Sequence, residues 1–372
     1  MPFSSSSAAG SAATLARLPG FLRQGSASAR VDQQKQLFSN LNQQERQRLQ
    51  AAYSLESPFS VAHAVQESTR NFNRYTDIVP YKHSQIHVYA GASTPVLYPL
   101  TFINASRITA PSSLQSSLPV EWRGYIATQA PLPQTQSRFW RMVSEQNVHV
   151  IVCLTAVSHD RSQRGQKAER YWPLAGETDE FDRDLHVRNL DKSDGEGKVV
   201  YRHFEIWNPI DTASERRQLL LVHYQGWPDH GVPSKTDDLR DILYKIRAWK
   251  SEQQRQPQQA SHQKDFGPMI VHCSAGCGRT GTFCVIDTIL SVLEKIRYPH
   301  LALSPSGLDP NNASVQAGEQ SPQGQQGYVY DWQGDRDVIY ETLSSFRQER
   351  MLMVQTASQY SFCYEAVRDL CQ

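Results

Sequence analysis

The sequence predicts an α/β domain in which helices cover both faces of a central sheet. Three short segments, at residues 148–155, 219–224 and 269–272, are apolar and rich in β-branched residues, as strands buried on both faces are. Two longer segments, 239–249 and 278–297, carry apolar residues three and four positions apart and predict covering helices. A chain of 372 residues with 39% hydrophobic residues can bury one large core of this kind.

The remaining segments divide the chain into an extension and one globular domain. Residues 1–54 are low in complexity, with a Gln-rich charged stretch near 33–53 that predicts a helix and flanking residues typical of disorder. We expect the globular domain to span 55–372. Within it, 252–264 is rich in Gln and 304–327 in Gly, Pro, Ser, Asn and Gln, so both predict flexible surface insertions.

The composition excludes several classes of function. The 38 basic and 37 acidic residues nearly balance, which argues against a nucleic-acid or membrane-surface partner. No stretch approaches the roughly 18 apolar residues of a membrane span, and the six cysteines do not form a secreted disulfide framework. We therefore expect a cytoplasmic protein, with the nucleus also open. Organellar targeting stays open as well, because a transit peptide and a disordered tail would share the Arg-, Ser- and Ala-rich composition of the first 31 residues.

The chemistry of the chain centres on the turn between the third predicted strand and the helix that follows it. Arg279 comes six positions after Cys273, and small residues separate the two: Ser274, Ala275, Gly276, Cys277 and Gly278. In such a turn successive backbone N–H groups can point inward, and the helix adds its positive N-terminal end. The turn therefore predicts a cradle for a phosphate dianion.

This cradle predicts a nucleophile and a phosphate clamp. Cys273 lies in the same positive potential, which should favour its thiolate at neutral pH. Arg279 offers a planar pair of donors to two phosphoryl oxygens. If Cys273 were a purely structural cysteine, the small residues that follow it and Arg279 would have no explanation. A metal site made of His272, Cys273 and Cys277 lacks a second pair of ligands, so we expect no metal and no cofactor.

The string HCSAGCGRTGTF at 272–283 resembles the signature of the protein tyrosine phosphatases, and the resemblance extends over about residues 55–370. It implies a single catalytic domain with a highly twisted mixed sheet, in which the phosphate-binding loop lies between a buried strand and a helix and Thr280 supports that loop. It also implies a tyrosine-specific, metal-independent phosphatase that works through a cysteinyl-phosphate intermediate. Within the family the chain resembles non-receptor members, most of all fungal ones.

Two further segments match the reacting groups of this family. Trp227-Pro228-Asp229 looks like the movable acid loop, which implies that Asp229 protonates the leaving oxygen and that Trp227 supports the loop. Gln355 is similar to the Gln that positions water for hydrolysis of the intermediate, with Gln359 as its companion. Without the resemblance, Asp229 would be a solvated turn residue and the two Gln residues would merely open a helix.

The segment NRYTDIVP at 73–80 looks like the phosphotyrosine-recognition loop of the family. The match implies that Tyr75 stacks on the substrate ring and that Asp77 holds the substrate backbone. A pocket with this aromatic wall would be deep, and a phosphoserine side chain would be too short to reach the nucleophile at its floor. The loop therefore predicts specificity for phosphotyrosine.

The resemblance also implies two supporting contacts, one from Tyr171 to His272 and one from Lys167 to Asp229. The chain departs from the family pattern before Lys167, where a Glu usually pairs with the cradle Arg and this sequence offers only Asp160. How Arg279 is oriented therefore stays open at this point.

Three other departures concern the pocket and its rim. Cys277 replaces the usual Ile or Val, and a packing role is favoured over a redox one. Lys82 stands where an acidic residue is common, and Leu352 stands where a glycine often opens a second groove. We expect the substrate preference to differ from that of better-known relatives.

The resemblance leaves two competing functions open and suggests one class of substrate. A dual-specificity phosphatase would share the Cys and Arg but not the recognition loop, and a phosphotyrosine-binding module would usually have lost the nucleophile or the acid. Several fungal members act on mitogen-activated protein kinases, so a kinase of this class is a candidate partner in signalling. We expect a monomer that acts on phosphotyrosine-containing proteins.

Overall fold

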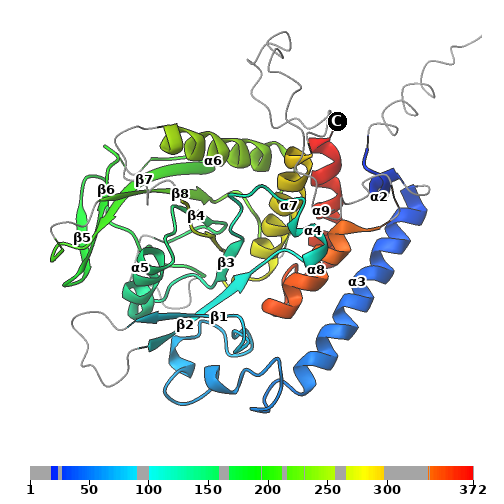
Figure 1. Ribbon diagram of the computed structural model, residues 1–372, viewed down its shortest axis with the longest axis horizontal. Helices are drawn as coiled ribbons and strands as arrows, with labels where there is room; N and C mark the ends of the chain where they lie inside the picture. Colours follow the sequence, from blue (N-terminus) through cyan, green and yellow to red (C-terminus); the bar gives the residue numbers. More distant parts are fainter. Residues whose placement is uncertain are drawn as a thin grey trace, which may run out of the picture.

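A large mixed sheet forms the centre of the computed structural model (Figure 1). The structure describes residues 18–23, 27–89, 100–158, 167–193, 195–211, 216–229, 231–255, 265–296, 334 and 336–371. Across these residues the strand order is β1-β2-β3-β9-β4-β8-β7-β6-β5. The strands are β1 (Gln85–Tyr89), β2 (Leu100–Ile108), β3 (Tyr125–Thr128), β4 (Val150–Cys153), β5 (Thr178–Asp182), β6 (Leu185–Asn189), β7 (Val199–Trp207), β8 (Arg217–Tyr224) and β9 (Met269–His272).

The helices lie on both faces of this sheet, as the apolar strands require. They are α2 (Gly20–Arg23), α3 (Ala27–Gln50), α4 (Ser112–Gln115), α5 (Gln136–Glu145), α6 (Asp237–Arg255), α7 (Gly278–Lys295), α8 (Val338–Glu349) and α9 (Ala357–Leu370). Short 3-10 turns occur at Ala62–Ala64, Arg70–Phe72 and Pro133–Thr135. The predicted α/β fold with a mixed sheet is confirmed.

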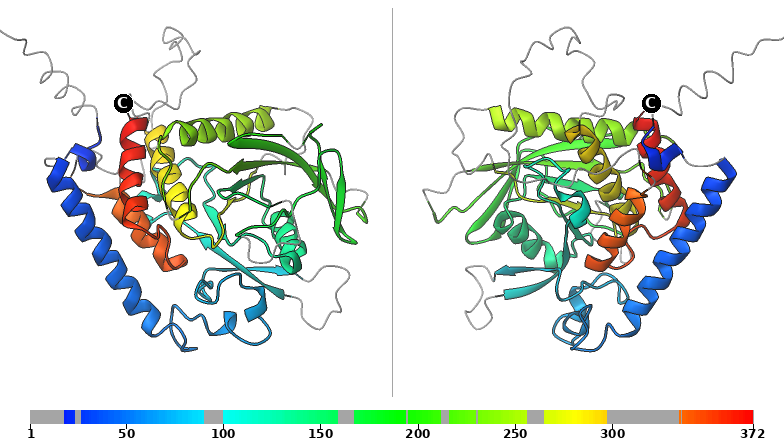
Figure 2. Two further views of the ribbon diagram at one scale, coloured as in Figure 1. Left: turned by 180° about the vertical axis from the view of Figure 1, so that it is seen from behind. Right: turned by 45° about the vertical axis from the view of Figure 1, so that its right-hand side comes forward.

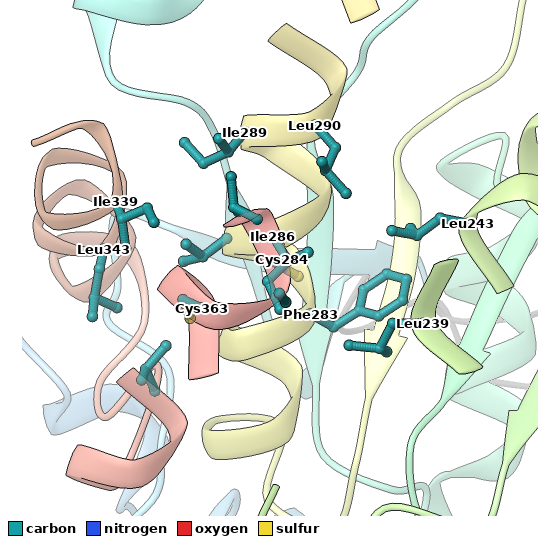
Figure 3. Packing of buried hydrophobic residues seen from close by; sticks show 14 of the residues in the cluster. Leu239, Leu243, Phe283, Cys284, Ile286, Ile289, Leu290, Ile339, Leu343 and Cys363 are labelled. Carbon is teal, nitrogen blue, oxygen red and sulfur yellow. The ribbon is translucent and has the colours of Figure 1, made fainter. Parts of the chain in front are cut away.

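The two faces of the sheet belong to different hydrophobic cores because side chains alternate along each strand. In β4, Val150 and Val152 face the core that contains α6, α7, α8 and α9, whereas Ile151 and Cys153 face the core that contains α5. Helix α7 lies at the centre of the first core, between side chains of α6, α8 and α9 (Figure 3). Because α7 is buried from Gly278 to Leu293, its N-terminus has a fixed position in the core.

The central strands place the predicted catalytic loop at one edge of the sheet. Strands β3, β9, β4 and β8 are parallel neighbours, so their C-terminal ends lie at the same edge. His272, the last residue of β9, stands in register with Thr128 of β3 and with Cys153 of β4. The loop that follows β9 therefore emerges at the carboxyl edge of the sheet.

The helix predicted near 33–53 is observed as α3, which lies alongside α8 and α9 (Figure 2). Its Phe38 and Leu41 are buried in the core that contains α9. The N-terminal extension therefore contributes to the packed body of the molecule, although a domain boundary at residue 55 remains a prediction.

The two predicted insertions have different outcomes. Residues 252–255 are the last turn of α6 and not part of a loop. Residues 256–264 and the whole of 304–327 lie outside the described residues, so their predicted flexibility stays a prediction. Among the described residues, no helix is both long and apolar enough to cross a membrane.

Candidate active site

The loop after β9 has the backbone that the cradle prediction requires. Gly276 adopts a φ of +74°, and a Cβ atom added there would lie 2.1 Å from the Thr128 carbonyl oxygen. No other residue fits that position without moving β3. Gly278 opens helix α7, so the N-terminal end of a buried helix lies at the loop.

Arg350 holds the outer side of this loop. Its side chain is fully buried, and it donates hydrogen bonds to the carbonyl oxygens of Gly276 (2.8 Å) and Ala275 (2.9 Å). It also donates to Asn104 Oδ1 at 3.0 Å and to Ser106 Oγ at 3.2 Å. By binding these carbonyl groups, Arg350 holds the loop in the conformation in which the Cys277 N–H group faces the Cys273 sulfur.

Cys273 lies at the base of the loop, with only 4% of its surface exposed. Burial alone would raise the pKa of its thiol. The Arg279 guanidinium, the Thr280 hydroxyl and N–H group, and the Cys277 N–H group outweigh burial and lower that pKa. Burial raises the pKa of Cys277 to about 12, so the pKa values of the two thiols of the loop are shifted in opposite directions.

The loop that carries Asp229 meets the cradle through Arg279. Arg279 donates from Nη1 to the Trp227 carbonyl oxygen at 3.3 Å and from Nη2 to Asp229 Oδ1 at 3.0 Å. Lys167 forms an ion pair with the same carboxylate, as the resemblance implied. Within the described part of the chain, Arg279 is thus oriented by Trp227 and Asp229, whereas Asp160 lies outside it.

The recognition loop borders the cradle from the other side. The Tyr75 hydroxyl lies 2.8 Å from Ser274 Oγ, and Ser274 in turn donates to the Lys167 carbonyl oxygen at 2.5 Å. The backbone N–H of Arg74 donates to Gln129 Oε1 at 2.8 Å, and its guanidinium pairs with Glu169. These contacts anchor the loop that carries Tyr75.

Gln355 and Gln359 lie directly over the start of α7. A Cβ atom added to Gly278 would lie 2.9 Å from Gln359 Oε1 and 3.2 Å from Gln355 Cβ. Gln359 also accepts the backbone N–H of Gln355 at 2.9 Å. The capping box formed by Thr356 and Gln359 fixes where α9 begins, and hence where Gln355 lies.

His272 is held behind the nucleophile as a neutral ring. Burial lowers its pKa to about 4. Its Nδ1 lies 3.0 Å from the Cys273 carbonyl oxygen, which can only accept, so Nδ1 carries the proton. The Tyr171 hydroxyl then donates to Nε2 across 2.7 Å. The implied contact between Tyr171 and His272 is present.

These groups surround one cavity of about 270 Å³. Most of the predicted site residues line it: Tyr75, Asp77, Lys167, Asp229, Cys273, Ser274, Ala275, Gly278, Arg279, Gln355 and Gln359. The other predicted residues, Gly276, Cys277, Thr280, His272, Tyr171 and Trp227, are not among its lining residues. Sequence reasoning missed Ile78 in the lining and Arg350 behind the loop, although an arginine directly before the apolar run at 351–354 was a signal for the latter.

A family model and several known proteins match most of this sequence. Residues 69–303 and 332–369 match the sequence model of a family described as Protein-tyrosine phosphatase. Tyrosine-protein phosphatase 3 of Dictyostelium discoideum is 29% identical over 311 residues, which cover 82% of this chain and 25% of that protein. Protein-tyrosine-phosphatase PTP1 of Arabidopsis thaliana is 31% identical over 298 residues, which cover 80% of this chain and 69% of that protein.

The human tyrosine-protein phosphatase non-receptor type 2 is 28% identical over 298 residues, which cover 80% of this chain and 55% of that protein. Its name fits the predicted non-receptor type. The chain thus matches only a quarter of the Dictyostelium protein and just over half of the human one. The predicted similarity to fungal members stays a prediction.

Proposed function

Because this chain belongs to the protein-tyrosine phosphatase family, we propose that it hydrolyses phosphotyrosine in protein substrates through a cysteinyl-phosphate intermediate. The observation that supports this proposal most is the convergence of three groups on one cavity. Cys273 with its lowered pKa, the Arg279 guanidinium and the Asp229 carboxyl group all line it. A thiolate, a phosphate clamp and an acid are the groups that transfer of a phosphoryl group to sulfur needs.

In the first step the Cys273 sulfur attacks phosphorus and the bond from phosphorus to the phenolic oxygen breaks. Inward N–H groups and Arg279 hold the equatorial oxygens as charge redistributes. Asp229 gives its proton to the leaving phenolic oxygen. Its ion pair with Lys167 and its hydrogen bond from Arg279 keep the carboxyl group beside the cradle.

In the second step a water molecule attacks phosphorus and the bond between phosphorus and sulfur breaks, with its electron pair returning to Cys273. Asp229 accepts the proton of that water. Gln355 lies over the cradle next to Gly278, where its amide can orient the water. Inorganic phosphate then leaves, and the thiolate is restored.

The selectivity for phosphotyrosine rests on Tyr75. Its hydroxyl lies beside Ser274 of the cradle, so its ring forms part of the cavity wall. A phosphotyrosyl side chain is long enough to lie along this wall and place phosphorus at the sulfur, whereas a phosphoseryl side chain is too short. This wall favours a tyrosine-specific enzyme over a dual-specificity phosphatase.

Purified full-length protein tests the proposal with phosphotyrosyl and phosphoseryl versions of one peptide, in the presence of a metal chelator. We expect phosphate release from the phosphotyrosyl peptide alone and its loss in Cys273→Ser. A matched control is Cys371→Ser, at the end of α9. Equal rates on both peptides would reject the deep-pocket argument, and no release from either peptide would favour a phosphotyrosine-binding module.

We propose a monomeric cytoplasmic or nuclear enzyme in signalling, with a mitogen-activated protein kinase as a candidate substrate. The Asp229→Ala variant should retain bound substrates, so proteins recovered with it from a lysate, identified by mass spectrometry, test this assignment. Recovery without any tyrosine-phosphorylated kinase would remove the kinase from consideration.

A further inference from the structure

The segment between α8 and Gln355 has an unusual backbone. Leu352 and Val354 adopt positive φ values of 57° and 58°, although neither is a glycine. Such conformations are energetically unfavourable for residues with a Cβ atom and persist only where the surroundings hold them. The contacts that hold this segment therefore determine where the next residue, Gln355, lies.

Helix α3 supplies one of these contacts directly. Glu45 Oε1 accepts the backbone N–H of Leu352 at 2.6 Å. Glu45 is 2% exposed, so this hydrogen bond forms away from solvent.

Helix α3 also acts on the segment through Arg347, which is fully buried. Arg347 donates to the carbonyl oxygens of Met353 (2.9 Å) and Val354 (2.7 Å). Its position is set from α3 by Glu45, at 3.3 Å, and by Asn42 Oδ1, at 2.8 Å. One carboxylate thus binds the segment at Leu352 and orients the guanidinium that binds the next two residues.

The segment also packs tightly against the cradle. The backbone N–H of Val354 donates to the Cys277 carbonyl oxygen at 3.3 Å. A Cβ atom added to Gly281 would lie 2.4 Å from that same backbone nitrogen. Because there is no free space here, a change in the backbone of Leu352 to Val354 should displace Gln355 relative to the cradle.

We infer that Glu45 is a positioning residue for the hydrolysis of the cysteinyl-phosphate. It keeps residues 351–354 in their strained conformation, so that Gln355 can orient the attacking water. This inference rests on the proposed function and deepens it, because it assigns a role in the second step to the N-terminal helix. Attack by Cys273 in the first step does not use Gln355 and should not depend on Glu45.

Rapid-quench kinetics separate the two steps. Full-length Glu45→Ala and Glu45→Gln are mixed with ³²P-labelled phosphotyrosyl peptide, the reaction is stopped with denaturant, and the labelled phosphoenzyme is followed with time. We expect Glu45→Ala to slow decay of the phosphoenzyme about tenfold while its formation rate stays within about twofold. Glu45→Gln can still accept from Leu352 and should show a smaller effect, which guards against a misfolded alanine variant.

Two control variants separate positioning from general loosening of α3. Leu41→Ala removes a fully buried α3 side chain and should lower stability without changing the ratio of decay to formation. Gln43→Ala changes an exposed residue of α3 and should change neither. If Leu41→Ala reproduces the kinetics of Glu45→Ala, the effect is general destabilisation and the inference is wrong.

A double-mutant cycle with Gln355→Ala tests the route of the effect. If Glu45 acts through Gln355, then Glu45→Ala adds little to the slow decay that Gln355→Ala already shows. Independent, multiplying effects would overturn the inference, as would equal slowing of formation and decay. A wild-type protein that forms no phosphoenzyme would instead refute the proposed function.

Discussion

At the scale of single residues, the cradle distinguishes Cys273 from the other cysteines. Positive groups lower the pKa of Cys273 despite its burial, whereas burial raises the pKa of Cys153 and of Cys277 to about 12. The thiolate is the reactive form of cysteine. Only one of these three buried thiols should therefore be a nucleophile near neutral pH.

This difference predicts selective alkylation of Cys273. We expect iodoacetamide at pH 6.5 to modify Cys273 and to leave Cys277 unmodified, with a pH profile whose midpoint lies below the free value of about 8.5. Arg279→Ala removes the largest favourable influence on the thiolate and should slow modification about tenfold or more. Peptide mapping by mass spectrometry measures both sites. A midpoint near 8.5 that Arg279→Ala does not move would contradict the electrostatic account.

Asp229 offers a second test at this scale. Asp229→Ala should lower turnover of a phosphotyrosyl peptide by about 10²–10⁴, because the phenolate would leave without its proton. An aryl phosphate with an acidic phenol needs that proton less, so its first step should slow by a smaller factor. Burst kinetics with both substrates supply the comparison. An equal loss on both would mean that Asp229 serves structure and not proton transfer.

At the scale of elements, the cradle depends on the backbone of Gly276. Gly276→Ala would place a methyl group against the Thr128 carbonyl oxygen at a positive φ. We expect it to abolish activity and to lower the free energy of unfolding by about 3 kcal/mol or more. Gly176 has a similar φ of +77° with nothing within 4 Å of an added Cβ atom. Gly176→Ala should therefore cost only about 1 kcal/mol in urea denaturation and keep full activity.

How far the sequence predicts these elements depends on whether their signal is local. The strands β4, β8 and β9 and the helices α6 and α7 follow from apolar runs and periodicity. Strand β9 has the predicted bounds, and the bounds of the other four differ from the prediction by two to six residues. The sequence signal for the cradle is also local, because the residues of the cradle are consecutive. The contact of Glu45 with Leu352 joins residues 307 positions apart, and no local pattern contains it.

The orientation of Arg279 likewise cannot be predicted from a local sequence pattern. The sequence lacks the expected Glu, and nothing in the order of residues says that the Trp227 carbonyl group would be within reach. That contact depends on the position of a whole loop relative to α7, which packing in three dimensions sets. The resemblance to the family predicts that Asp229 acts as the acid, whereas the hydrogen bond that Asp229 accepts from Arg279 is seen only in the structure.

At the scale of the whole molecule, buried titratable groups make stability depend on pH in opposite directions. Burial lowers the pKa of His149 to about 3 and that of His272 to about 4, from 6.5. The unfolded chain therefore binds more protons below pH 6.5, and stability falls as the pH drops from there. Burial raises the pKa of Glu349 from 4.5 to about 7, so this group lowers stability as the pH rises across that window.

The Glu349 effect predicts a stabilising substitution. Glu349 accepts from the Thr109 N–H at 2.7 Å and from its hydroxyl at 2.5 Å, and an amide can keep both partners. Glu349→Gln should raise the free energy of unfolding at pH 8 by about 1–3 kcal/mol and change it little at pH 4, where the native carboxyl is protonated. Glu67→Gln, at a side chain that is 92% exposed, is the matched control. Equal changes at both pH values in urea titrations would show that charge is not the cause.

Helix α3 decides whether the N-terminal extension is part of the folded unit. It buries Phe38 and Leu41 against the core, and its Glu45 pairs with the fully buried Arg347. A chain that begins at residue 51 would expose that apolar surface and leave the Arg347 cation without this carboxylate. We expect it to lose on the order of 5 kcal/mol of stability relative to a chain that begins at Leu18, which keeps every described contact. Urea denaturation of the two chains decides the matter: coincident midpoints would mean that α3 is an appendage and that the boundary near residue 55 is correct.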